Sequence, residues 1–367
     1  MEKIKLGDLC TPSQGQLKEK PDTVIDYIDI SSVDNETKKV TGYQTMTFSE
    51  SPSRARKAVK RGSILVSTVR PNLNAVAILE NDTPNLSVAS TGFCILDCKE
   101  DTDERFVFNY CKSKVFIDDM VSQATGASYP AVSDKIVRSA LIPAYSYEKQ
   151  RHIGIILDKV SDVIEKRREE LQALDKLIKA RFVEMFGDPV LNPFSWEMKR
   201  FDEICENLDS RRKPISSGDR VEGIYPYYGA SGIVDYVEDY IFDEDILLVS
   251  EDGANLLMRS TPIAFSVSGK VWVNNHAHVV RFDKMSLQKY VEIYFSLIDI
   301  SDSITGSAQP KLNQAKLNAM MIPIPEDTLL DRYCEFLYQV DKSKVIVQKA
   351  LDEIQTLFDS LMQEYFG

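Results

Sequence analysis

Apolar residues recur every seven positions in two stretches of the chain, 148–187 and 327–367. Within each stretch the spacing alternates between three and four residues and is kept for about five heptads, which is typical of a coiled coil rather than of an ordinary surface helix. The pattern predicts two long helices whose apolar seams pack against a partner. The predicted partner-binding seam residues are Leu157, Ile164, Leu171, Leu174 and Ile178 in the first stretch, and Leu337, Val340, Leu351, Ile354 and Phe358 in the second.

Polar residues interrupt the two seams at different places. Arg167 in the first stretch corresponds to Val347 in the second, and Ile164 corresponds to Lys344. This mismatch disfavours pairing of each helix with its own copy and favours pairing of the two unlike helices. The alternative is two independent amphipathic helices, each lying on its own domain.

The seams belong to a longer repeat, because residues 121–187 recur without a gap at 301–367. Both copies contain a Thr-Gly pair, then a short apolar segment that ends in Ile-Pro, then the long helix. The matching pairs are Thr125-Gly126 with Thr305-Gly306, Pro130 with Pro310, Ile142-Pro143 with Ile322-Pro323, and Phe186-Gly187 with Phe366-Gly367. We interpret the chain as a tandem duplication.

A domain of short strands and loops precedes each helix, at 1–147 and 188–326. The apolar runs Gly62–Ser67 and Asp245–Ser250 look like the same buried strand in the two copies. We expect an α+β fold in which two related mixed α/β domains are each followed by a long helix, at 148–187 and 327–367. The front parts of the domains differ much more than the back parts, so they are expected to recognise two different things.

Composition limits the function classes. The content of apolar (43%) and charged (27%) residues is that of a soluble globular protein, and no run is long and apolar enough to span a membrane. The charged start of the chain is not a signal peptide and the six cysteines form no paired motif, so we expect a cytoplasmic protein without a zinc site. The net charge of −12 counts against a protein that holds DNA by bulk charge, although not against one with a local basic face.

Signatures of catalysis are missing from the sequence. It has no phosphate-binding loop, no nucleophile elbow and no glycine-rich cofactor loop, and Asn192-Pro-Phe-Ser-Trp196 lacks the second proline of a methyltransferase motif. His276 and His278 have no cysteine or acidic residue at ligand spacing, which favours a hydrogen-bonded structural role over metal binding. We predict no catalytic residues and no metal site.

Basic clusters are the best candidates for a binding site. Residues 51–70 carry basic side chains and no acidic one, and a second cluster opens a loop in the second domain. Arginine and asparagine read guanine and adenine edges in the major groove, and lysine contacts phosphates. The candidate DNA-binding residues are Arg54, Arg56, Lys57, Lys60, Arg61, Arg70, Asn72 and Asn74 in the first domain, and Arg211, Arg212, Lys213, Tyr227 and Tyr228 in the second.

Four segments carry a resemblance to a known family. They are Met185-Phe-Gly-Asp-Pro189 with Asn192-Pro193 and Trp196, Tyr225–Gly232, Asn274–His278, and Thr305–Leu312 with Ile322-Pro-Ile-Pro325. In this order they resemble the specificity subunits of type I restriction-modification systems, over essentially the whole chain. The first copy departs from the pattern, because Ile142-Pro-Ala-Tyr145 lacks the second proline.

The resemblance implies a subunit without chemistry of its own. Two target-recognition domains would each read half of a split site in double-stranded DNA, and the two helices would pack antiparallel as a spacer. It adds Gln309 and Lys311 to the candidate DNA-binding residues. Two methyltransferase subunits would bind the helical region and carry S-adenosylmethionine, and restriction subunits, where present, would use ATP and Mg²⁺. The chain itself would hold no cofactor.

Two other functions remain open from the sequence. The acidic charge and the heptads also suit a protein-binding scaffold that dimerises through its helices. A single enzyme that both modifies and cuts DNA is the third reading, and the missing cofactor and nuclease motifs argue against it.

Overall fold

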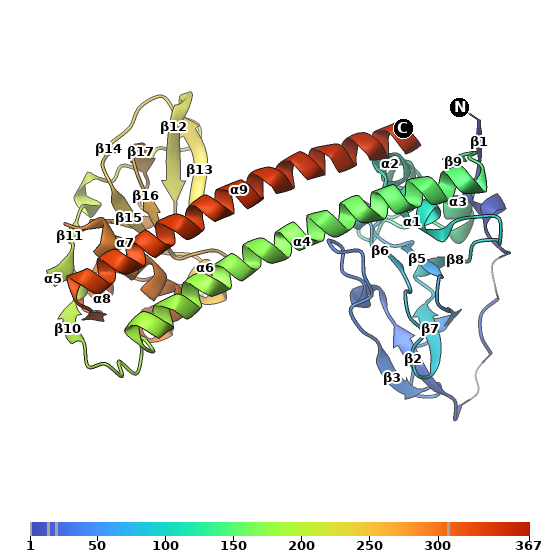
Figure 1. Cartoon of the computed structure of the whole chain (residues 1–367), viewed down its shortest axis with the longest axis horizontal. Coiled ribbons are helices and arrows are strands. Elements are labelled where there is room, and N and C mark those ends of the chain that lie inside the picture. Colours follow the sequence, from blue (N-terminus) through green and yellow to red (C-terminus); the bar gives the residue numbers. More distant parts are fainter. Residues whose placement is uncertain (1, 13–14, 19–20, 307–308) are drawn as a thin grey trace. The chain divides into compact units, whose positions relative to one another are not determined.

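The computed structural model describes residues 2–12, 15–18, 21–306 and 309–367. The chain divides into two compact units (Figure 1). Unit 1 contains Met1–Glu169 and Gln348–Gly367, and unit 2 contains Glu170–Val347. Both long helices, α4 (Tyr147–Phe186) and α9 (Asp327–Phe366), therefore contribute residues to both units. No helix in the described part of the chain has the length and apolar character needed to cross a bilayer.

Unit 1 is built from three small sheets. The first pairs β1 with β9, the second has the order β3-β2-β7-β4, and the third has the order β6-β5-β8. All neighbouring strands are antiparallel except β2 and β7, which are parallel. The strands are β1 (Lys3–Lys5), β2 (Val24–Ile28), β3 (Gln44–Thr47), β4 (Ala55–Ala58), β5 (Ile64–Ser67), β6 (Val76–Ile78), β7 (Leu86–Ser90), β8 (Phe93–Leu96) and β9 (Leu141–Pro143). The helices are η1 (Leu6–Leu9), η2 (Ile30–Ser32), η3 (Pro71–Leu73), α1 (Glu104–Lys112), α2 (Lys114–Gln123) and α3 (Asp134–Ser139).

Unit 2 has the same sheet plan. Its sheets are β10-β19, β13-β12-β17-β14 and β11-β18-β15-β16, and again one pair, β12 with β17, is parallel. The strands are β10 (Glu197–Arg200), β11 (Glu206–Asn207), β12 (Glu222–Gly229), β13 (Gly232–Val237), β14 (Phe242–Asp243), β15 (Ile246–Ser250), β16 (Ala264–Val267), β17 (Lys270–Val273), β18 (Ala277–Arg281) and β19 (Met321–Ile324). The helices are α5 (Phe201–Ile204), η4 (Asp209–Arg211), α6 (Asn255–Met258), α7 (Met285–Leu297), η5 (Ser301–Ser303) and α8 (Gln314–Asn318).

The buried strand expected in both copies is present as β5 and β15. Each is fully buried and lies between two antiparallel neighbours, β6 and β8 in unit 1, and β16 and β18 in unit 2. Strand β11 has a counterpart in unit 1, where Cys10 forms an isolated antiparallel bridge to Cys98, just after β8. Because the strand orders and directions agree, residues of the two units are compared below by their place in these sheets.

The core of unit 1 includes the first half of α4 and the last turns of α9. Ile153 and Leu157 pack in one cluster with Phe366, which is fully buried. The ring of Phe366 lies 5.4 Å from the ring centre of Phe106 and 5.7 Å from that of Tyr110. The end of α9 is thus an integral part of unit 1, although it is separated from the rest of that unit in the sequence.

The core of unit 2 includes the last turns of α4 and the first half of α9. Phe182 of α4 stacks on Tyr290 of α7, with ring centres 5.1 Å apart. The Tyr333 hydroxyl of α9 donates a hydrogen bond of 3.0 Å to the Ile178 carbonyl of α4. Lys344, a polar seam residue, pairs with Asp175 of α4 at 2.7 Å.

The predicted seam residues face the interior in both helices. The buried ones are Leu157, Ile164, Ile178, Leu337, Val340 and Leu351, and the half-buried ones are Leu171, Leu174, Ile354 and Phe358. The heptad pattern therefore identified the packed face of each helix.

Candidate nucleic-acid interface

In each unit, loops at equivalent positions of the fold lie together at one end of the buried central strand, β5 or β15. In unit 1 the turn after β5 bridges to the Thr-Gly loop through Val69 and Ala131, and Thr125 pairs with Ala131 to close that loop. In unit 2 the corresponding bridges join Asp252 to Lys311 and Thr305 to Lys311. We call these regions the loop ends of the units. In unit 1 the loop end comprises residues 69–74, 91–92 and 125–131, and in unit 2 it comprises 251–259, 274–276, 305–306 and 309–311.

The glycine of each Thr-Gly pair is required by the shape of its loop. Gly126 has a φ of +103°, and a Cβ on it would lie 2.9 Å from the Tyr129 carbonyl oxygen. Gly306 has a φ of +83°, and a Cβ on it would lie 2.6 Å from the Gln309 carbonyl oxygen. Only glycine fits both the left-handed backbone and the close approach, so the repeated Thr-Gly motif reflects loop geometry.

Arg70 is the most prominent cation of the loop end of unit 1. It is exposed, and its guanidinium lies over the ring of Tyr129, 4.8 Å from the ring centre. Asn72, also exposed, follows in η3. Tyr129 was not among the predicted residues, although it occupies in the first repeat the place that Gln309 occupies in the second. The repeat itself was the signal that could have identified it.

The other basic residues of 51–70 do not form one patch. Lys60 and Arg61 precede β5 and lie at the end of that strand away from Arg70. Arg54 lies next to the loop end, where its carbonyl accepts from the Thr91 N–H at 2.7 Å, and its guanidinium bonds to the Tyr27 hydroxyl and to Asp29. Arg56 lies over the ring of Phe48, 5.0 Å from its centre. Although the sequence run has no acidic residue, the fold supplies a carboxylate to Arg54 and a ring to Arg56 from other segments.

Lys57 and Arg212, both predicted to contact DNA, have the same internal role in the two units. The Lys57 ammonium donates to the Phe93 carbonyl at the start of β8 and to the Asp134 carboxylate, both at 2.6 Å. Arg212 donates to the Ala277 carbonyl, at the start of β18, at 2.7 Å. Their side chains are only 14% and 13% exposed. These two predictions are corrected: the cations hold the start of a core strand and do not face solvent.

Asn74 and Tyr227 are also corrected. The Asn74 amide is buried and donates to the Cys111 carbonyl at 2.9 Å, because the left-handed backbone at this residue turns its side chain inward. Tyr227 is 1% exposed, and its hydroxyl accepts a hydrogen bond from the Ile215 backbone N–H. Alternation along β12 places the Tyr227 side chain on the buried face of its sheet, where it cannot reach a ligand.

The remaining candidates of unit 2 have mixed surroundings. Arg211 pairs with Glu244 at 2.6 Å and lies over the ring of Phe242. Tyr228 is half-buried beside Phe265. Lys213 and Gln309 are exposed, and the half-exposed Lys311 ammonium lies 3.0 Å from the Glu251 carboxylate. Arg211, Lys213, Gln309 and Lys311 are thus exposed, and Lys213 and Gln309 are the two among them for which no ion pair is described.

A charged cluster fastens the loop end of unit 2 to its core. Asp209 accepts hydrogen bonds from the Val279 backbone N–H at 2.8 Å and from His278 at 2.6 Å. Glu251 pairs with Arg212 at 2.6 Å. The other ring nitrogen of His278 faces the Leu312 carbonyl at 2.8 Å, so both nitrogens face acceptors, and only the protonated imidazolium can donate from both. The cluster joins four segments of the chain.

The carboxylates of this cluster remain ionised despite their burial. Burial works to raise the pKa of Asp209, but the hydrogen bond and the charge of His278 outweigh it, so the pKa lies below the usual range. Burial also works to raise the pKa of Glu251, and the bonds from Arg212 and Lys311 outweigh it in the same way. The cluster is thus a set of mutually stabilising charges.

The same cluster has the composition of a metal site. Ligand atoms of Asp209, Glu251 and His278 lie within 4.8 Å of one another. The Arg212 and Lys311 cations already neutralise these carboxylates and would repel a metal ion, and both nitrogens of His278 are engaged in hydrogen bonds. The acidic neighbours of His278 come from distant segments, so the spacing of residues in the sequence does not reveal them. The contacts of His278 are those of a hydrogen-bonded core residue.

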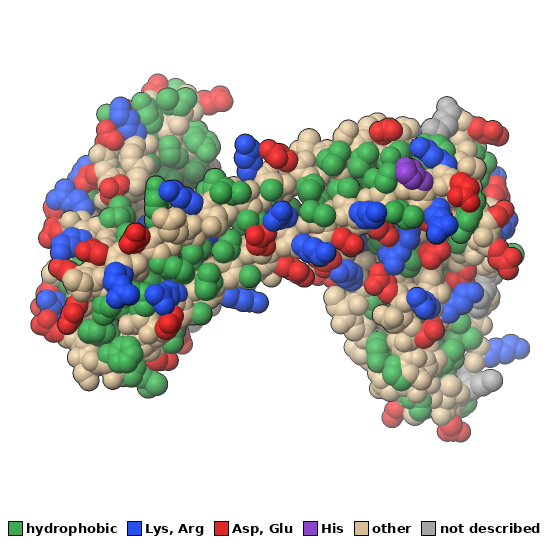
Figure 2. Space-filling view, viewed as in Figure 1, with side chains coloured by type: hydrophobic (Ala, Val, Ile, Leu, Met, Phe, Trp, Pro, Cys, Tyr) green, Lys and Arg blue, Asp and Glu red, His purple; other side chains and the backbone are tan. Residues whose placement is uncertain are grey.

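Charges of both signs are interspersed over the surface that Figure 2 shows, without a continuous basic face on that side. This distribution agrees with the net charge of −12. On this face the cations are therefore scattered rather than gathered into a broad positive field.

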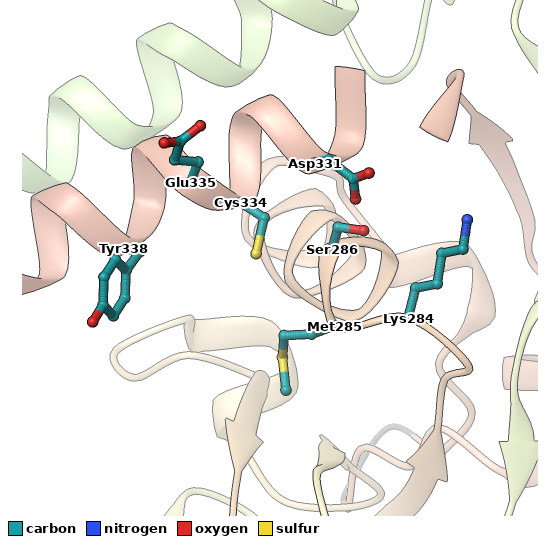
Figure 3. Close-up of a pocket in the computed structure, with 7 residues that line it drawn as sticks. All are labelled: Lys284, Met285, Ser286, Asp331, Cys334, Glu335 and Tyr338. Carbon is teal, nitrogen blue, oxygen red and sulfur yellow. The ribbon is translucent and has the colours of Figure 1, made fainter. Parts of the chain in front are cut away.

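A pocket of about 600 Å³ lies in unit 2 between the start of α7 and α9 (Figure 3). It is lined by Lys284, Met285, Ser286, Asp331, Cys334, Glu335 and Tyr338. Tyr338 is 59% exposed, and farther along α9 Val345 and Ile346 are 68% and 69% exposed. In unit 1 the position of Cys334 in the repeat is taken by Gly154, which packs directly against Asp103 and Arg105. Charged, polar and apolar side chains thus line the pocket together, and exposed apolar side chains recur farther along α9.

Comparison with known proteins identifies relatives of both halves of the chain. The family model for the type I restriction modification DNA specificity domain matches residues 1–175 and 193–356. A Haemophilus influenzae protein named as a type I restriction enzyme specificity subunit is 36% identical over 140 residues, which are 38% of this chain and 36% of that protein. The chain thus matches about a third of the length of that relative.

Two further comparisons extend over most of the chain. The specificity subunit of the type I restriction enzyme MjaIX from Methanocaldococcus jannaschii is 21% identical over 337 residues, covering 82% of this chain and 76% of the relative. The crystal structure of a type I restriction-modification S subunit from M. genitalium has a TM-score of 0.62 and 15% identity, with 100% of this chain and 96% of that one covered. The likeness in structure extends to the whole fold.

Proposed function

Since the chain belongs to the family of type I restriction modification DNA specificity domains, we propose that it is the DNA-recognition subunit of a type I restriction-modification enzyme. In this proposal each unit reads one half of a two-part target in double-stranded DNA. One observation carries it: the family model matches both halves, and each half has its own loop end on the same sheet plan. The two loop ends carry different side chains, as two different half-sites require.

The proposed recognition surface is smaller than the sequence suggested. In unit 1 it consists of Arg70, Asn72 and Tyr129. In unit 2 it consists of Lys213, Gln309 and Lys311. These are exposed polar side chains of the kinds that contact bases and phosphates. A partner that shares the phosphate contacts would offset the acidic charge of this chain.

We further propose that α4 and α9 pair as an antiparallel coiled coil that sets the distance between the half-sites. Two observations support this. Early residues of α4 share the core of unit 1 with late residues of α9, and late residues of α4 share the core of unit 2 with early residues of α9. An antiparallel pair satisfies both sets of contacts.

In this proposal the chain performs no chemistry itself. Two methyltransferase subunits bind its helical region and carry S-adenosylmethionine, and restriction subunits, in a system that has them, use ATP and Mg²⁺. The complex works in the cytoplasm, where the DNA is. The pocket beside Tyr338 and the exposed Val345 and Ile346 support a partner surface on α9. The same apolar surface favours the second candidate function, a protein-binding scaffold without DNA recognition.

The domain assignment predicts the result of an exchange. Residues 1–147 are replaced by the matching domain of a family member with a known, different target. We expect one half of the methylated sequence to change and the other half to stay, because each unit reads its own half-site. Sequencing that detects methylated bases in cells carrying the exchanged gene measures the outcome.

The reciprocal exchange of residues 188–326 is the control and should change only the other half-site. If one exchange alters both half-sites, or neither, the assignment of one domain to each half-site is wrong. If the unmodified chain directs no methylation, the scaffold function is favoured instead.

The helical spacer predicts the result of an insertion. Seven residues are inserted after Glu169 in α4 and seven after Val347 in α9, where both helices pass from one unit to the other. One heptad adds about 10 Å of helix, or about three base pairs of DNA, and keeps the seam in register. We expect methylation at the original spacing to fall to background and any remaining methylation to appear at a longer spacing.

Insertion of five residues at the same points is the matched control, because it breaks the heptad register and should destabilise the helices. Methylation that continues at the original spacing after the heptad insertion contradicts the spacer role.

A further inference from the structure

Arg70 adopts a backbone conformation that side chains ordinarily avoid. Its φ is +49° and its ψ is +62°, in the left-handed region. In unit 2 the same place in the fold is taken by Gly253, with a φ of +107°. The match rests on equivalent hydrogen bonds: the Arg70 N–H donates to the Pro130 carbonyl at 2.7 Å, and the Gly253 N–H donates to the Pro310 carbonyl at 3.0 Å. Glycine thus fits this turn without strain. Unit 1 has an arginine there, whose left-handed backbone makes the folded state less stable.

At two other non-glycine residues with a positive φ, the side chain makes hydrogen bonds that stabilise the fold. The Arg259 guanidinium donates to the Phe295 and Ile298 carbonyls at 2.8 and 3.0 Å, and the Asn74 amide donates to the Cys111 carbonyl. Both side chains fasten the fold. The Arg70 guanidinium has a different neighbour, the ring of Tyr129, which is itself 68% exposed. The strained arginine and its stacking partner both face solvent, so the stability of the unit does not explain them.

We propose that Arg70, stacked on Tyr129, reads a guanine in the half-site recognised by unit 1. The inference rests on the DNA-recognition function proposed above and names the residues that determine specificity in that unit. The guanidinium is a planar fork of donors, and guanine offers two acceptors, O6 and N7, in the major groove. Stacking on the tyrosine fixes the plane of the fork before DNA binds, which lowers the ordering cost of the contact.

The Thr-Gly loop holds the tyrosine in place for this contact. Tyr129 lies four residues from the closing Thr125, whose N–H and carbonyl both bond to Ala131, at 3.0 and 2.9 Å. In unit 2 the same loop position carries Gln309, and the Arg70 position carries a glycine. The two units therefore present different donors at the same place. This difference fits two half-sites of different sequence.

The test uses the full chain in cells that also produce its methyltransferase partner, with the methylated bases mapped by sequencing. In Arg70→Gly we expect the guanine in one half-site to be replaced by any base among the methylated sites, and methylation of the original site to fall about 10- to 100-fold. The other half-site should stay unchanged. The melting temperature of the purified variant should equal or exceed that of the wild type, because glycine relieves the left-handed backbone.

Three further variants separate base reading from charge and from folding. Arg70→Lys keeps the positive charge and can still donate to O6 and N7 but loses the planar fork, so it should weaken the guanine preference less than Arg70→Gly does. Tyr129→Ala should weaken methylation about two- to fivefold, and Tyr129→Phe, which keeps the ring, should leave it unchanged. Lys99→Ala is the matched control and should leave both half-sites intact, because this exposed cation follows β8, whose end pairs with the start of β5, away from Arg70.

Each outcome decides the proposal. A guanine preference that is weaker in Arg70→Lys and absent in Arg70→Gly supports the proposal. An unchanged half-site in Arg70→Gly overturns it, because Arg70 then contacts phosphate or no part of the DNA. If Arg70→Gly melts at a lower temperature, Arg70 serves stability, and the proposal also fails. A wild-type chain that directs no methylation at all contradicts the proposed function instead, so the two failures are distinguishable.

Discussion

Replacing Asp209 with alanine is expected to lower the free energy of unfolding of unit 2 by about 3 kcal/mol. The Asp209 carboxylate is 8% exposed and accepts bonds from His278 and from the Val279 backbone. Its removal leaves Nδ1 of the buried His278 and the Val279 N–H without their shared carboxylate acceptor. We place the loss at the lower end of the range for broken buried ion pairs because Glu251 remains 3.8 Å from the His278 ring. Urea unfolding followed by tryptophan fluorescence measures the loss, since Trp196 and Trp272, the two tryptophans, both lie in unit 2.

Glu206→Ala is the matched control for this variant. Glu206 pairs with Arg281 between the neighbouring strands β11 and β18, but both side chains are about half exposed. Exposed pairs contribute less than about 1 kcal/mol, so this variant should unfold almost like the wild type. Equal losses in the two variants would show that burial of the cluster around His278 does not determine its contribution.

Replacing Phe366 with alanine is expected to lower the free energy of unfolding of unit 1 by about 3 to 5 kcal/mol. The ring is fully buried between Phe106 and Tyr110, and alanine leaves a cavity that these rings cannot fill without moving. Hydrogen exchange in peptides from α1 and α2 measures the loss, because these helices pack around the ring.

Leu357→Ala is the control, because Leu357 lies on the same segment of α9 and is 49% exposed. It should change the free energy of unfolding by less than about 1 kcal/mol. If Phe366→Ala leaves exchange in α1 unchanged, the end of α9 does not belong to the core of unit 1.

The recognition surface was only partly predictable. Arg70, Asn72 and Lys213, predicted to contact DNA, are exposed in the structure, whereas Lys57 and Arg212, predicted with them, are largely buried. For a basic residue near a glycine-rich loop, the local sequence does not show whether the side chain faces solvent or a carboxylate from a distant segment. Asp134 lies 77 residues from Lys57, and Glu251 lies 39 residues from Arg212. Contacts over such separations are not visible in a local pattern.

The sequence by itself determined the elements with a strong period or an exact repeat. The seven-residue spacing identified the packed faces of α4 and α9, because a helix exposes one side to water wherever it lies. The ungapped repeat identified the two Thr-Gly loops, whose glycines are required by the local backbone. Both features depend on residues close together in the chain, so both can be read from a single sequence.

Only the tertiary structure decided which cations are available for binding. It paired Lys57 with Asp134 and Arg212 with Glu251, and it placed Tyr129 beneath Arg70. The heptads likewise could not show that the last turns of α9 complete the core of unit 1. The physical reason is the same in each case: the free energy of a charge or of an apolar side chain depends on what the fold places around it, and segments distant in sequence supply those neighbours.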